Sequence, residues 1–325
     1  MWRNGSIALG VLCSVVGLPA EQTRSPAAAG RGGTTVPYDA SVYRPIDLDR
    51  AARDEFGPTA RAVAVGNHLY DWRASVNSAL KPLDVKRAVA SQYGPAWKLV
   101  ALGVGKDDWK AVDVTHLQFV ILPVMEVASD RWFDIAGVSA GLARYRTVLT
   151  ATRNWYQAQV GKTFRYVQPI VIYTDKTSAQ WNAISASTEV PDTDPNRWNL
   201  INEVKKHYLA HLPMPGAQLA VAAAPYSGDS PNVWLGAADT DHFAIAPPRA
   251  TSVTCPATGA QNALCADAEY AIGHELGHAF GLSHSCVAYP SNRLCEASIM
   301  QARKPWSAIL LPAEIAALQA SAFFH

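Results

Sequence analysis

The run HELGHAFGLSH at residues 274–284 constrains this chain more than any other feature of its sequence. On a helix, His274 and His278 stand one turn apart on the same face, so both imidazoles can reach one ion. Neutral imidazole nitrogen suits zinc in tetrahedral geometry. Glu275 follows the first histidine, where its carboxylate can face a water at the open position of the metal and accept its proton. The run therefore predicts a zinc site with a general base beside it.

Gly281 predicts how a third ligand joins the other two. A helix that continued past this position would carry His284 to the wrong side of the ion. Glycine permits the left-handed conformation that ends a helix and reverses the chain. We therefore expect His284 to return towards the ion and to complete a three-histidine ligand set.

These five positions match in full the extended zinc motif of the metzincin clan of proteases, and the chain resembles that clan. Downstream, Ser298-Ile299-Met300 is similar to the clan's Met-turn. In the clan, the methionine lies under the three histidines and supports them without binding the metal. Without the motif, Met300 would be read as ordinary core packing.

Within the clan, the resemblance points in more than one direction. Ser285, directly after the third histidine, resembles the matrixins, whereas the long segment before Met300, with its two cysteines, resembles other branches. Ala302 stands where astacin-like and serralysin-like enzymes carry an extra tyrosine ligand, so no tyrosine ligand is expected. The resemblance covers roughly Val138–His325.

The resemblance implies an α/β (α+β) catalytic domain over residues 136–325, with a twisted mixed sheet, an active-site helix, a Met-turn and a C-terminal helix. Hydrophobic patterns predict the elements of the whole chain. Helices are expected at 69–80, 83–93, 142–160, 197–212 and from 312 to about 322, and strands at 98–103, 117–124, 163–173, 218–224 and 233–246.

The same resemblance implies how a substrate binds. A protein or peptide substrate would lie extended and pair with an edge strand above the active-site helix. Gln218–Ala224 is the expected edge strand, and Val233–Ala237 is the alternative. The pocket for the residue after the scissile bond would be walled by the zinc helix and by Gln301–Trp306.

The N-terminus predicts export. Residues 1–20 read as a secretory signal peptide, because Arg3 precedes a short apolar run that ends in small residues. Cleavage as late as residue 29 fits equally well, and the apolar run is too short to span a bilayer. Leu12 before Cys13 argues against a lipoprotein. We therefore expect a secreted, extracellular or periplasmic protein.

Two segments separate the leader from the catalytic domain. Residues 21–37 are rich in small and polar residues and predict a flexible lead-in. Residues 38–135 predict a separate N-terminal unit, either a propeptide or an accessory domain. No cysteine remains before Cys255 once Cys13 has left with the leader. An inhibitory N-terminal region would therefore act by another ligand or by steric cover, not by a cysteine switch.

Four cysteines then remain, an even number that implies disulfides in an exported chain. Three pairings are open, and the local one, Cys255–Cys265 with Cys286–Cys295, is our first choice. None of the spacings matches a cysteine-ligated zinc site.

Three further features of the sequence give only weak evidence of a functional site. His207 and His211 also stand one helical turn apart, but no glutamate follows the first and no third ligand is evident, so we expect solvated or capping histidines. His242, within Asp239–His242, could join a structural zinc or calcium site, but its ligand set is too thin to predict one. Ten tryptophans are explained by packing before a carbohydrate platform is needed.

The net charge of +1 comes without a basic stripe or a Gly-rich phosphate loop, so no nucleic-acid partner is expected. The sequence thus predicts a secreted metalloendopeptidase that uses one Zn²⁺. A calcium ion is possible but unsupported. The oligomeric state, the natural substrate and the cleavage preference stay open. A zinc hydrolase of a non-peptide amide and a non-catalytic module with a structural zinc are the rivals. Glu275 argues against the second rival, because a structural site gains nothing from a general base.

Overall fold

The computed structural model describes residues 41–188, 195–213, 216, 218–226, 237–238, 241–246, 249–252, 263–301 and 308–325. The described residues belong to one compact unit. The signal peptide and the lead-in predicted for residues 1–37 lie outside the described residues. Every helix within the described part is too short or too polar to cross a membrane.

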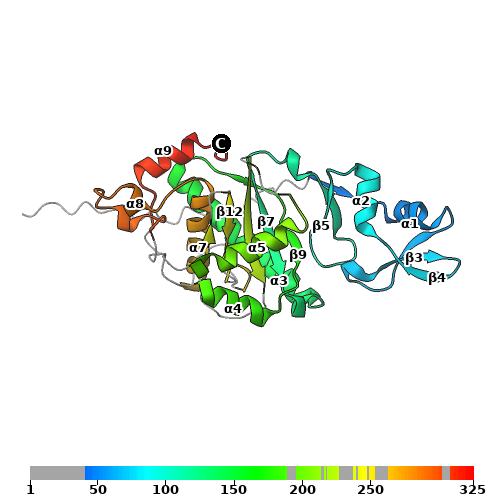
Figure 1. The fold of residues 1–325 in the computed structure, drawn as a ribbon. Coiled ribbons are helices and arrows are strands. Elements are labelled where there is room, and N and C mark those ends of the chain that lie inside the picture. Colours follow the sequence, from blue (N-terminus) through cyan, green and yellow to red (C-terminus); the bar gives the residue numbers. More distant parts are fainter. Residues whose placement is uncertain are drawn as a thin grey trace, which may run out of the picture. The chain divides into compact units, whose positions relative to one another are not determined.

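A mixed sheet organises the structure, and the predicted α/β (α+β) class is confirmed (Figure 1). Among the described residues nine strands join it, in the order β1-β6-β5-β9-β7-β10-β12-β11, with β8 also pairing with β7. Strands β8, β9 and β10 run parallel to β7, and β12 runs parallel to β10; the remaining pairings are antiparallel. The bounds are β1 Tyr43–Pro45, β5 Lys98–Ala101, β6 Trp109–Val112, β7 Val120–Val127, β8 Arg165–Tyr166, β9 Ile170–Tyr173, β10 Leu219–Tyr226, β11 Ala237–Ala238 and β12 Phe243–Ile245.

Helices cover both faces of this sheet. Because side chains alternate along a strand, β10 sends Ala220, Ala222 and Ala224 into one core and Leu219, Val221 and Ala223 into a second. The first core contains residues of α3 (Ile135–Val160), α7 (Ala263–Ala279) and α9 (Pro312–Ala320). The second contains residues of α4 (Ser178–Thr188) and α5 (Asn199–Leu209). Short helices α6 (Arg249–Ser252) and α8 (Ser285–Ala288) complete this part.

Helix α3 shows how the sequence sets its own boundaries. The Asp134 carboxylate accepts a hydrogen bond from the Gly137 backbone amide at 2.9 Å, which caps the first turn. The helix ends at Gly161, whose φ of 74° lies in the left-handed region. It begins seven residues before the start predicted at residue 142.

A small three-stranded antiparallel sheet lies in the N-terminal part, where the predicted helix over 69–80 is wrong. A short 3-10 turn, Leu69–Asp71, leads into the hairpin of β3 (Trp72–Val76) and β4 (Ala79–Pro82), and β2 (Arg61–Ala64) pairs with β3. Asn77 and Ser78 form the hairpin turn with φ of 49° and 66°. A two-residue turn with positive φ at both positions matches the twist of paired strands. The helices of this part are α1 (Leu48–Phe56) and α2 (Val85–Tyr93).

The main sheet continues across the boundary that the sequence placed at residues 135–136. Strand β7 lies inside it between β9 and β10, and β5 extends it by pairing with β9. The domain predicted for residues 136–325 therefore leaves out β7, although this strand is paired on both sides.

The strand expected to receive the substrate is also different. The segment Gln218–Ala224 overlaps β10, which is paired on both sides, so it cannot be an edge strand. The alternative, Val233–Ala237, reaches the described residues only at Ala237, which begins β11. Strand β11 pairs only with β12 in the described sheet and ends its order.

Candidate metal centre

Helix α7 carries His274, Glu275 and His278 and ends in the way that Gly281 predicts. Gly281 has a φ of 93°. Its amide donates to the His278 carbonyl at 2.8 Å, and the Leu282 amide donates to the Gly277 carbonyl at 2.9 Å. This pair of bonds is the Schellman motif, which satisfies carbonyls at the end of the helix while the chain reverses.

The reversal brings the third histidine to the other two. One ring nitrogen from each of His274, His278 and His284 lies within 4.8 Å of those of the others. The Nε2 atoms of His274 and His278 are 3.1 Å apart. The ring centroid of His284 lies 5.4 Å from that of His274 and 4.7 Å from that of His278. The three predicted ligands thus converge on one point.

Backbone carbonyls fix the tautomers of the two helical histidines. Nδ1 of His274 donates to the Ile299 carbonyl at 2.6 Å, and Nδ1 of His278 donates to the Leu282 carbonyl at 2.7 Å. Because a carbonyl can only accept, the proton sits on Nδ1 and each Nε2 presents a lone pair. Two lone pairs facing each other at 3.1 Å repel unless a cation lies between them.

The donor set fits zinc. Two nitrogens bound to a tetrahedral zinc ion at 2.0–2.1 Å lie roughly 3.3 Å apart, close to the spacing of the two Nε2 atoms. Burial, and then the neighbouring His278, lower the pKa of His274 to about 3. Burial also lowers the pKa of His278. Both imidazoles are therefore neutral at neutral pH, as metal ligands must be.

Glu275 is buried next to these ligands, with 7% of its surface exposed. Burial raises the pKa of its carboxyl to about 8, because removal from water disfavours the charged form. A divalent cation nearby would act in the opposite direction and favour the carboxylate.

Met300 is fully buried against α7. A Cβ atom at Gly277 would lie 2.2 Å from the Met300 sulfur, and one at Gly273 would lie 2.8 Å from Cδ1 of Ile299. Glycine at both positions therefore allows the chain at 299–300 to approach the helix.

Sequence reasoning missed these two glycines, although a signal was present. Gly273 and Gly277 stand one helical turn apart and share a face of α7. Each costs a helix interior about 1 kcal/mol relative to alanine, so such a pair calls for a packing reason.

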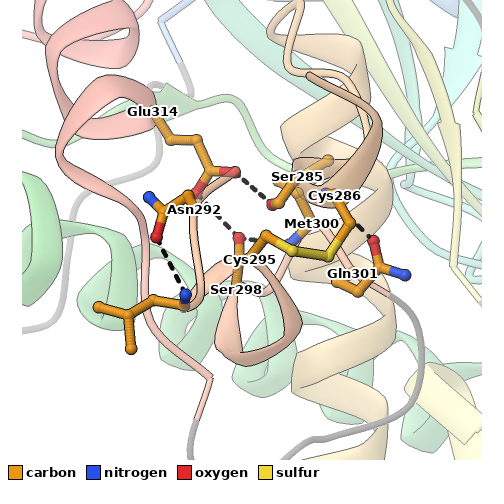
Figure 2. Close-up of a disulfide and its surroundings, with 9 residues drawn as sticks. Ser285, Cys286, Asn292, Cys295, Ser298, Met300, Gln301 and Glu314 are labelled. Atoms are coloured by element: carbon orange, nitrogen blue, oxygen red, sulfur yellow. Dashed lines mark hydrogen bonds between the residues drawn. A yellow bond between two sulfur atoms is a disulfide. The ribbon is translucent and has the colours of Figure 1, made fainter. Parts of the chain in front are cut away.

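A buried carboxylate supports this centre from the last helix (Figure 2). Glu314 of α9 accepts hydrogen bonds from the hydroxyls of Ser285 and Ser298, the latter at 2.8 Å. It also accepts the Leu311 amide at 2.7 Å at the start of its own helix. The Ser298 hydroxyl in turn accepts the Met300 amide at 3.0 Å. One side chain thus connects the residue after the third histidine, the chain leading to Met300 and α9.

Glu314 was not among the residues singled out from the sequence. Its position offered a signal, since a glutamate two residues after Pro312 stands at the third position of a helix. There its carboxylate can reach back to an unpaired backbone amide. The two serine contacts, by contrast, depend on the tertiary fold.

The predicted Cys286–Cys295 disulfide is present beside this network, with the two Cα atoms 4.9 Å apart (Figure 2). Cys255 lies outside the described residues, so the predicted Cys255–Cys265 pair stays a prediction; Ala302 and most of the Gln301–Trp306 segment also lie outside them.

The predictions for the three other histidines singled out from the sequence, His207, His211 and His242, fare differently. His211 Nδ1 donates to the His207 carbonyl at 3.0 Å near the end of α5, so the capping role is confirmed for it. A solvated His207 is wrong, because this residue is buried among carboxylates. His242 Nδ1 donates to the Ala279 carbonyl at 2.6 Å and so caps α7, while the neighbouring Asp241 pairs with Lys205 at 3.1 Å.

Comparison with known proteins gives a distant structural likeness. No protein-family model and no curated protein sequence matches this chain. Among solved structures, wild-type OgpA from Akkermansia muciniphila matches with 13% identity and a TM-score of 0.35, over 62% of this chain and 60% of that chain. Catalytically inactive OgpA in complex with an O-glycopeptide, glycodrosocin, matches with 12% identity and a TM-score of 0.37, over 64% of this chain and 61% of that chain. This chain thus spans about three fifths of OgpA.

Proposed function

We propose that this chain is a secreted, zinc-dependent endopeptidase in which His274, His278 and His284 hold the ion and Glu275 is the general base. The observation that carries the proposal is the pair of facing Nε2 lone pairs beside the buried carboxyl. Those imidazoles are oriented for a cation, and a purely structural site would not need the carboxyl.

The chain's own residues divide the work of hydrolysis. When bound, zinc supplies a Lewis acid and lowers the pKa of a coordinated water towards about 7. Glu275 accepts the proton of the attacking water and can deliver it to the leaving amine. His274 and His278 keep their orientation through the carbonyls of the chain at 299 and 282. Met300 and Glu314 position the surrounding turns.

The substrate proposal changes with the strand order. Main-chain pairing needs an edge with free amides and carbonyls. Strand β11 ends the described order of the sheet, whereas β10 is enclosed. We therefore place an extended protein or peptide substrate along β11, with no cleavage preference assigned.

Proteolysis by paired variants tests this function. Glu275→Ala is expected to lower kcat/KM for casein by about a hundredfold to ten-thousandfold, because the general base is lost. Zinc content, measured by elemental analysis, stays at the wild-type level. Glu296→Ala, which removes an exposed carboxylate outside the site, is the matched control and keeps its activity.

The outcomes separate the rival functions. Full proteolysis by Glu275→Ala would exclude this mechanism. Absence of proteolysis in the zinc-loaded wild type, with cleavage of small amides, would favour the non-peptide hydrolase. A chelator that leaves proteolysis intact would exclude the metal. N-terminal sequencing of the exported chain tests secretion and locates the leader cleavage.

A further inference from the structure

A second group of metal-ligating side chains lies at the carboxyl ends of β7 and β9. Glu126 is the residue before the last of β7 and lies on the same face of the strand as Leu122 and Val124. Asp175 follows β9, and Glu203 and His207 stand one turn apart on α5. Leu122 and Val124 belong to the core that contains α4 and α5, not to the core that contains α7. The group therefore lies on the opposite face of the sheet from the three-histidine centre.

Three of these side chains converge on a common point. His207 Nε2 lies 2.7 Å from an oxygen of Asp175 and 3.5 Å from an oxygen of Glu203. One ligand atom from each of the three lies within 4.8 Å of those of the other two. The ligand atoms of the three-histidine centre lie equally close to one another. One imidazole and two carboxylates form a donor set that zinc and similar divalent transition metals accept.

A fourth residue, Glu126, points to a ligand. Its side chain is fully buried, and neither carboxylate oxygen has a hydrogen-bond partner. One of these oxygens lies 3.5 Å from Nδ1 of His207, which also lacks a hydrogen bond. A buried carboxylate without partners is costly, so a closed ion-pair network would not leave these atoms unsatisfied.

The arrangement places a carboxylate 3.5 Å from the ring nitrogen of His207 that faces away from the candidate ligands. In metal sites with a histidine ligand, a carboxylate accepts the distal N–H of the imidazole, so the other nitrogen keeps its lone pair for the metal. Glu126 stands at Nδ1 of His207, and the two candidate carboxylate ligands stand at Nε2.

Two lysines supply the positive charge in the present structure. Lys176 lies 3.2 Å from Glu203 and 3.6 Å from Asp175, and Lys206 lies 3.3 Å from Glu203. Both side chains are long and flexible, so their ammonium groups can turn to water when a divalent cation takes their place.

We propose that Asp175, Glu203 and His207 bind a second divalent transition metal ion, with zinc as the probe, and that Glu126 orients His207. This ion joins α5 to the end of β9, and water completes its coordination. The site is independent of the proposed peptidase centre.

Zinc counting on the full chain tests the site. After loading with zinc and removal of the excess, elemental analysis is expected to give two ions per wild-type chain. Asp175→Asn, a change at a largely exposed side chain, is expected to give one. His274→Ala with His278→Ala, which removes the first centre, is also expected to give one. His211→Ala is the matched control. This histidine lies just after the end of α5 and outside the ligand set, so the variant is expected to keep two ions.

Two results would overturn the site: an Asp175→Asn chain that holds as many ions as the wild type, or a His274→Ala/His278→Ala chain that holds none while its circular dichroism stays native. The latter result would leave the peptidase proposal intact. Should His274→Ala/His278→Ala unfold, the difference between the wild type and Asp175→Asn still decides the question.

The role of Glu126 has its own measurement. Glu126→Gln is expected to weaken zinc binding at this site by about tenfold to a hundredfold, as loss of an orienting carboxylate does. Competition with a chromophoric chelator measures this affinity in the chain that lacks the first centre. An unchanged affinity would remove Glu126 from the site.

Discussion

At the residue scale, backbone carbonyls determine the tautomer and the orientation of two of the histidines, His274 and His278. The imidazoles of His274 and His278 are oriented by carbonyl groups, so mutation of side chains near them cannot easily reverse the tautomers. One of these carbonyls belongs to Leu282, directly after the glycine that ends α7. The conformation of Gly281 is therefore connected both to the orientation of His278 and to the return of His284.

Gly281→Ala tests this connection, with Gly161→Ala as the matched control. Both glycines have positive φ at the end of a helix, and an added Cβ meets nothing within 4 Å at either. Each substitution is expected to lower the free energy of unfolding by about 1–2 kcal/mol, the cost of a left-handed alanine. Only Gly281→Ala should also weaken zinc binding. Urea unfolding and chelator competition measure the two effects, and an equal loss of zinc affinity in Gly161→Ala would contradict the argument.

At the element scale, the support of the candidate metal centre comes from packing between elements far apart in the sequence. Ile299 and Met300 approach α7 at the two glycines, and α9 reaches the same turn through Glu314. Figure 2 shows this carboxylate beside the serines that it accepts from. Because its partners are buried with it, removal of the carboxylate leaves several donors unsatisfied.

Glu314→Ala is therefore expected to lower the free energy of unfolding by about 3 kcal/mol or more, since buried donors lose a charged acceptor. Glu296→Ala removes an exposed carboxylate from a neighbouring turn and should change stability by less than about 0.5 kcal/mol. Chemical denaturation of the zinc-free chains provides both values and keeps metal affinity out of the comparison. Equal stability of the two variants would exclude a structural role for Glu314.

At the scale of the whole molecule, the sheet joins the N-terminal part to the part that carries the zinc motif. Strand β7 is buried along its whole length and is paired with β9 and β10. A propeptide that ended at residue 135 would remove this strand from the interior. If the N-terminal region is released to activate the chain, the cleavage must therefore lie before Val120.

A truncation series tests this requirement. A chain that starts at residue 136 lacks β7 and is expected to remain unfolded, because two internal strands lose their partner. A chain that starts at residue 41 retains every described strand and is expected to fold. Near-ultraviolet circular dichroism distinguishes the two. A folded, zinc-binding chain from residue 136 would show that the two parts are independent.

Activity of the two forms of the chain addresses the role of residues 38–135, which stays a proposal. The intact chain and the naturally processed chain are incubated with a general peptide substrate. Higher activity after processing would identify an inhibitory region, and equal activity would exclude one.

The sequence by itself determined the local geometry of the candidate site. Two histidines one turn apart, the glutamate beside the first and the helix-ending glycine follow from helical geometry and from the conformational freedom of glycine, which depend on neighbours in the chain. The boundaries of α2 and α9 and the Cys286–Cys295 pair are similarly local. The hairpin at Asn77 and Ser78 was missed because the apolar pattern of so short a segment fits a helix as well as a pair of strands.

Only the tertiary structure decided what depends on distant segments meeting. Strand order made β10 an internal strand and β11 the edge, because pairing is a property of neighbours in space and not of the strand's own sequence. The close packing of Ile299 and Met300 against α7 explains why residues 273 and 277 are glycines. The fold brought His207 to Glu126 and Asp175, residues from three separate segments whose proximity no spacing along the chain could reveal.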